Sequence, residues 1–160
     1  MRRKHGMPLD DRIMPYLQMA GLAHFARLNN YWFRLDEPLV SAFVERWCSK
    51  THTFHLSFGE CIITLQDVAY QLGLPIDGQY VSRCLTDSKQ YIEGGRCTWM
   101  QETFSDLPEG ADEETVRRYA RACIMILLSM QLFNDKSGTH MHIRWLPYVA
   151  RLKDMGRYSW

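Results

Sequence analysis

Two cysteines and two histidines that lie close together in the sequence have the chemistry of metal ligands. Cys48, His52, His55 and Cys61 form the pattern C-x3-H-x2-H-x5-C. Structural zinc sites usually take pairs of ligands two to four residues apart on a tight turn, whereas these four straddle an expected hairpin. The pattern therefore favours ordinary polar strand histidines and two buried thiols, and we expect no bound metal.

A second candidate chemistry is the reading of DNA by a helix-turn-helix. Residues 64–69 followed by Leu72 and Gly73 resemble the first helix and the turn of that motif, and residues 81–85 resemble the end of a recognition helix. However, Pro75, Asp77 and Gly78 fall where the second helix would have to begin. A capped packing helix followed by a turn is the interpretation that we prefer.

The sequence contains none of the catalytic motifs that we looked for. The sequence contains no G-x-S-x-G, no glycine-rich phosphate loop and no H-E-x-x-H, so we expect no enzyme and no cofactor. An acidic cluster precedes and begins an expected helix, where a solvated helix cap explains it better than a pair of acid–base carboxylates. Its members are Asp106, Glu109, Asp112, Glu113 and Glu114.

Three arginines on the same expected helix are the remaining candidates for contact with a ligand. Arg117, Arg118 and Arg121 have the charge to meet the phosphates of a nucleic acid or the acidic groups of a protein partner. The alternative is that they form the solvent face of the helix. The formal net charge of the chain is +1, so any nucleic-acid site would have to be local.

The composition limits the class of protein. The 160 residues are 46% hydrophobic, enough for one domain with a core. Five cysteines without regular spacing suggest reduced thiols inside the cell. The N-terminus has no apolar stretch of a secretory signal, and the longest apolar run is far too short to span a bilayer.

Local signals predict the helices and strands that would hold these residues. A helix is expected to end at Gly21, a short one at residues 29–30, and a third to begin at Asp36 with Pro38 in its first turn. Residues 53–56 and 61–64 predict a β-hairpin. Thr64 and Asp67 form a capping box for the next helix, which Gly73 ends.

The second strong element is a helix over residues 112–133. Acidic residues occupy its first turn, and residues 124–128 are apolar on all sides, which predicts a buried central pillar. We expect one core in which this pillar meets the hairpin and the helices before and after it. The side chains expected to pack with residues 124–128 are Leu39, Phe43, Trp47, Phe54, Leu56, Ile63, Leu65, Val68 and Leu72.

Three blocks of sequence carry a resemblance to a known family. The first contains Val44-Glu45-Arg46-Trp47 and residues 51–56, 58–61 and 65–75. The second contains Trp99 and residues 102–104, 112–114 and 118–122. The third contains residues 132–133 and 135–138, Trp145-Leu146-Pro147 and residues 156–160. These strings resemble the plant mobile domain, a family also called aminotransferase-like or MAIN-like. The resemblance covers residues 10–160, with residues 1–9 as a flexible N-terminus.

The resemblance implies a function that the residues themselves do not reveal. Members of the family are related to transposable elements, and those encoded by the host act in the nucleus in transposon silencing, control of gene expression and meristem maintenance. Some pair with, or are fused to, a long-form plant serine/threonine phosphatase. The family has no established catalytic residues, and none of the lysines lies in a pyridoxal-phosphate context.

From composition and resemblance together, we expect a mainly α fold with a small β-hairpin, in a single domain. We expect a non-enzymatic nuclear interaction module with a protein partner and without a membrane. The alternative is a fragment derived from a transposable element that binds nucleic acid or is associated with a transposase.

The chain also differs from the family pattern. Relatives usually continue past Trp160 into another apolar helix and carry a further segment between Arg96 and Cys97, and Cys48 stands where arginine is common. The resemblance therefore implies a shortened copy with uncovered apolar side chains. The side chains expected to be exposed are Trp99, Trp145, Tyr148, Leu152, Tyr158 and Trp160.

Overall fold

The computed structural model describes residues 9–31, 34–81, 91–133, 140–142 and 145–160. Helices predominate, and short strands form three small sheets, so the fold is mainly α with a small β component, as predicted. In the described part of the chain, no helix is both long and apolar enough to cross a membrane.

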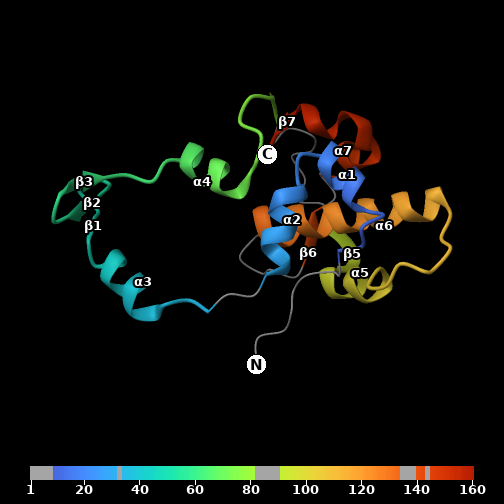
Figure 1. Cartoon of the computed structure of the whole chain (residues 1–160), viewed down its shortest axis with the longest axis horizontal. Helices are drawn as coiled ribbons and strands as arrows, with labels where there is room; N and C mark the ends of the chain where they lie inside the picture. Colours follow the sequence, from blue (N-terminus) through green and yellow to red (C-terminus); the bar gives the residue numbers. More distant parts are fainter. Residues whose placement is uncertain (1–8, 32–33, 82–90, 134–139, 143–144) are drawn as a thin grey trace.

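The core lies between helices from the two ends of the chain, which gather on one side of the molecule (Figure 1). They are α1 (Met14–Met19), α2 (Ala23–Asn30), α5 (Cys97–Thr103), α6 (Glu113–Ile126), the π-helix η1 (Leu127–Leu132), α7 (Leu146–Ala150) and the 3₁₀-helix η3 (Leu152–Arg157). The largest side chains that the core encloses completely are Leu17, Leu22, Ile124, Leu128 and Met155.

Helix α6 and its continuation η1 form the predicted central pillar. Asp112 caps α6 by accepting a hydrogen bond from the amide of Thr115 at 3.2 Å, so the predicted start is confirmed. The predicted apolar stretch is also confirmed, because every residue from Ile124 to Leu128 is at most 3% exposed. The helix widens at Leu127 into the π form, which sequence periodicity did not predict.

The C-terminal segment returns to the middle of the chain and is fixed there by backbone pairing. Strand β4 (Gln79–Tyr80) pairs in parallel with β7 (Tyr158–Ser159), and the indole N–H of Trp160 donates to the carbonyl of Ala20 at 3.2 Å. Pro147 occupies the first turn of α7, so it begins a helix here rather than interrupting one. A third small sheet pairs β5 (Tyr91–Arg96) with β6 (His140–His142).

Most of the side chains expected to be uncovered near the C-terminus are covered in part. Trp145 and Leu152 are buried, which corrects the prediction for these two. Tyr148, Tyr158 and Trp160 are half-buried and pack edge to face on one another, whereas Trp99 is exposed as predicted. The larger exposed apolar surface lies elsewhere, on residues 34–68.

Residues 34–61 form a unit that we call the arm, which extends away from the core (Figure 1). It consists of α3 (Glu37–Val44) and a three-stranded antiparallel sheet of β1 (Trp47–Cys48), β2 (Thr53–Leu56) and β3 (Gly59–Cys61). Asp36 caps α3 as predicted, with its carboxylate accepting from the amide of Leu39 at 3.1 Å. The hairpin is confirmed, but its second strand is Gly59–Cys61 rather than residues 61–64, and β1 was not predicted.

The arm disproves the prediction of one shared core. Phe54 stacks on Phe43 with ring centroids 4.2 Å apart and meets Trp47 at 4.8 Å, so the hairpin packs on α3 and not on the pillar. Neither α3 nor α4 (Leu65–Leu72) contains a buried residue. Of the nine side chains predicted to pack against residues 124–128, only Leu72 packs against the buried cluster. Periodicity identified which faces are apolar, but not what covers them.

Candidate interaction surfaces and family membership

The register of the arm's sheet separates the proposed metal ligands. Cys48 lies opposite Thr53, and Cys61 lies opposite Phe54. Because neighbouring residues of a strand point to opposite faces, the two cysteines project from opposite sides of the sheet. Among the residues that the structure describes, no three histidine, cysteine or acidic side chains form a group that could hold a metal ion.

One face of this sheet carries a small polar network. The hydroxyl of Thr51 lies 2.7 Å from that of Thr53 and 3.2 Å from Nε2 of His55, and His55 lies 3.6 Å from a carboxylate oxygen of Glu60. Hydrogen bonds from Thr51 lower the pKa of the Cys48 thiol. These groups are exposed and satisfy one another, so the network fixes the β1–β2 turn without forming a catalytic pocket.

Helix α4 connects the arm to the core, and its ends are fixed by local interactions. The Thr64 hydroxyl accepts from the amide of Asp67 at 3.1 Å, and Asp67 accepts from the amide of Thr64 at 2.8 Å, which is the predicted capping box. This hydrogen bonding lowers the pKa of Asp67. Gly73 ends the helix with φ +63°, and a Cβ there would lie 2.7 Å from the ring of His24.

The apolar face of α4 is covered at one end only. Ala69 and Leu72 pack against the buried cluster, as helix periodicity requires for one face. The same face continues toward the arm beyond the edge of the core, where Leu65 is 88% exposed and Val68 is 41% exposed. Ile62 and Ile63 precede it and are also exposed. We call Ile62, Ile63, Leu65 and Val68 the α4 overhang.

In the part of the chain that the structure describes, the segment after α4 lacks the second helix of a helix-turn-helix. Residues 73–78 contain no helix and lead into strand β4, so no second helix follows the turn where that motif needs it. The proposed end of a recognition helix, residues 82–85, lies outside the described residues.

The three candidate arginines are engaged by acidic side chains of the same helix. Arg117 forms an ion pair with Glu113, which lies one turn earlier on the helix. Arg118 and Arg121 lie 4.0 Å and 3.5 Å from the same carboxylate oxygen of Glu114. Glu114 thus offsets part of their charge, and the face is not a bare phosphate-binding surface. Of the acidic residues expected at the start of this helix, Asp112 caps it, and Glu113 and Glu114 lie in its first turn.

Beside Arg118 and Arg121 lies a groove of about 550 Å³ between α5, α6 and α7. Its walls are mainly apolar, with Met100, Phe104 and Met125 among them, and the two arginines belong to its lining. The Nε atom of Arg121 is enclosed by the protein, and the Nη1 atom of the same side chain pairs with Glu114. The charge that a ligand in the groove could meet is therefore that of the exposed guanidinium groups, with Arg118 67% exposed. Sequence analysis singled out the arginines but not the groove, which depends on how three helices pack.

The family model described as Plant mobile domain matches residues 21–160. This chain belongs to the plant mobile domain family. No solved structure matches it.

Proteins from Arabidopsis thaliana are similar to this plant mobile domain. Protein MAIN-LIKE 2 is 34% identical over 142 residues, covering 79% of this chain and 21% of that protein. Serine/threonine-protein phosphatase 7 long form homolog is 33% identical over 173 residues, covering 96% and 12%. Protein MAINTENANCE OF MERISTEMS is 30% identical over 152 residues, covering 81% and 32%. This chain therefore spans about a third or less of these relatives.

The comparison with the phosphatase homolog also concerns the length of the domain in the two proteins. It extends over 173 positions, more than the 160 residues of the chain. The relative therefore has residues in the matched span for which this chain has no counterpart, which agrees with the expectation of a shortened copy.

Proposed function

We propose that this plant mobile domain is a non-enzymatic interaction module that binds a protein partner through the α4 overhang. The observation that carries the proposal is the apolar face of α4, which is covered by the core at Ala69 and Leu72 and uncovered at Leu65 and Val68. A helix that is held by the core at one end and exposes half of its apolar face to water offers a hydrophobic surface for a protein partner to cover.

The partner that we propose is a phosphatase of the plant long-form class, acting with this domain in the nucleus. The support is that a protein named as a serine/threonine-protein phosphatase 7 long form homolog contains a region similar to 96% of this chain. Domains that occur in one chain in some proteins are candidates to associate as separate chains in others. The processes in which the complex would act are transposon silencing, control of gene expression and meristem maintenance, the last of which appears in the name of a relative.

The experiment is a pull-down from plant nuclear extract with the full chain as bait, with and without nuclease. We expect a long-form phosphatase, identified by mass spectrometry, to be captured in both conditions. Leu65→Asp should abolish capture, and it should leave α4 folded because an acidic residue in a first helical turn is favourable. Tyr70→Gln is the matched control, since Tyr70 is equally exposed but lies on the opposite face of α4.

Two results would count against the proposal. Capture that disappears with nuclease, together with binding to DNA or RNA that weakens steeply with salt, would favour the nucleic-acid alternative. Capture of the phosphatase that Leu65→Asp leaves unchanged would show that the α4 overhang is not the binding surface.

A further inference from the structure

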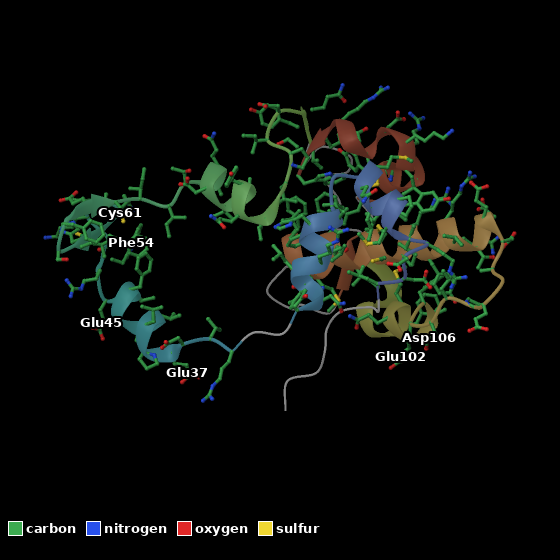
Figure 2. The ribbon with its side chains drawn as sticks, in the orientation of Figure 1. Glu37, Glu45, Phe54, Cys61, Glu102 and Asp106 are labelled. Carbon is green, nitrogen blue, oxygen red and sulfur yellow. The ribbon has the colours of Figure 1, made fainter. Side chains whose placement is uncertain are left out.

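Helix α3 of the arm has an exposed face that combines apolar and acidic side chains. Val40 and Val44 lie one turn apart and are 44% and 61% exposed, and Glu37 lies on the same face at the i, i+3, i+7 spacing. Phe43 points instead to the sheet, where it stacks on Phe54. Glu37 and Glu45 project from the two ends of the helix (Figure 2). The acidic residues Asp36, Glu37 and Glu45 all lie within residues 36–45, and the basic residue Arg46 comes directly after them.

The groove between α5, α6 and α7 has the complementary properties. Its walls offer apolar contact from Met125 and Val149, and Arg118 and Arg121 give one edge a positive charge that the single carboxylate of Glu114 only partly offsets. The Arg118 side chain is 67% exposed, so its charge is open to a ligand in the groove. A short helix that carries two aliphatic side chains and a carboxylate would fill the groove and pair with that charge.

The chain's own arm is not in this groove. The arm extends from one side of the core, and α5, α6 and α7 lie on the other (Figure 1). Each copy nevertheless carries both halves of the contact, so two copies can make it twice in a closed two-fold arrangement.

We propose that the groove binds helix α3 of a second copy of this chain, so that the arm of each copy lies in the groove of the other in a closed dimer. Val40 and Val44 occupy the apolar part of the groove, and Glu37, which shares their face of α3, lies opposite Arg118 and Arg121. The inference goes beyond the proposed function, because it concerns α3 and the groove rather than the α4 overhang.

The test is the mass of the full chain by light scattering over a concentration series. The wild type should shift from monomer to dimer below roughly millimolar concentration. Two charge-reversed variants, Glu37→Arg and Arg118→Glu/Arg121→Glu, should each weaken the dimer by roughly tenfold or more, because each brings like charges together. Phe58→Ser is the control and should change nothing, since Phe58 is 84% exposed on the arm but lies in the hairpin turn, away from α3.

Mixing the two charge-reversed variants provides the decisive measurement. In a mixed dimer the reversed arm meets the reversed groove, and the original arm meets the original groove, so both contacts are favourable again. We therefore expect a heterodimer to form in the mixture at concentrations where each variant alone is a monomer. If Arg118→Glu/Arg121→Glu fails to fold, judged by circular dichroism, Leu146→Asp on the edge of the groove replaces it and should weaken the wild-type dimer.

Three results would overturn the inference: a wild-type monomer throughout the series, a dimer that none of these changes weakens, or a mixture that stays monomeric. None of them bears on the pull-down, because Leu65→Asp leaves α3 and the groove unchanged. A chain that captures the phosphatase but stays monomeric would thus refute this inference and keep the proposed function.

Discussion

Leu128 is completely enclosed in the pillar, whereas Leu65 is 88% exposed on the α4 overhang, so the same substitution should have different effects at the two positions. Leu128→Ala leaves a cavity and should lower the free energy of unfolding by about 2–5 kcal/mol. Leu65→Ala should change it by less than about 0.5 kcal/mol. Urea unfolding followed by circular dichroism measures both. Similar losses at the two positions would mean that Leu65 is covered in solution.

The same distinction corrects the prediction for Val68. Its periodicity placed it in the core, where Val68→Ala would cost about 1–3 kcal/mol. It is 41% exposed, so the expected loss falls below that range. The sequence identified the apolar face of α4 correctly, and it failed at Val68 because coverage depends on how far the core extends.

Two of the cysteines, Cys48 and Cys123, should differ in reactivity. Burial raises the pKa of the Cys123 thiol to about 12, so this group holds almost no thiolate at neutral pH. Cys48 is partly exposed, and hydrogen bonds from Thr51 lower its pKa. Brief alkylation at neutral pH followed by peptide mass spectrometry should label Cys48 and leave Cys123 unlabelled until denaturant is added. Labelling of Cys123 in the native chain would contradict the enclosed core.

At the scale of the elements, helix boundaries were the most predictable part of the fold. Asp36, Thr64 and Asp112 were each predicted as caps, and each accepts a backbone amide three residues later. Helix caps can be predicted from the sequence because the capping side chain and the amide that it binds are only three positions apart. The pairing of β4 with β7 joins residues 79–80 to residues 158–159, and no local pattern carries that information. The groove was missed for the same reason.

The capping box of α4 should respond to both mutation and acid. Thr64→Ala removes a hydrogen bond to the helix terminus and should cost about 1 kcal/mol of α4 stability. The pKa of Asp67 is lowered in the folded chain from an ordinary value of 3.8, so its contribution is present above that value and is lost as the pH falls through the lowered pKa. Hydrogen exchange of α4 amides measures both effects. Asp67→Asn is the control and should remove the acid response of α4; an unchanged response in that variant would assign it to another group.

At the scale of the whole molecule, the chain contains two clusters of apolar side chains that share few contacts. The larger one surrounds the pillar, and the smaller one consists of Phe43, Trp47 and Phe54 in the arm. Regions with few buried contacts open at a lower free energy than the core around them. The arm is therefore expected to open while the core stays folded, which suits a segment that would bind a second copy.

Phe54→Ala should separate the two clusters experimentally. Phe54 contacts both other aromatic rings of the arm, so its removal should abolish the amide protection of the sheet, including the hydrogen bond from the amide of His55 to the carbonyl of Arg46. The core does not depend on that contact, and the thermal midpoint of the helical circular dichroism signal should move by less than roughly 2 °C. Hydrogen exchange by mass spectrometry measures the arm, and circular dichroism measures the mainly helical core. Phe58→Ala is the matched control, because its ring is exposed in the hairpin turn and its loss should affect neither. If Phe54→Ala instead lowers the midpoint of the whole chain as much as Leu128→Ala does, the arm and the core unfold together, and the arm does not open on its own.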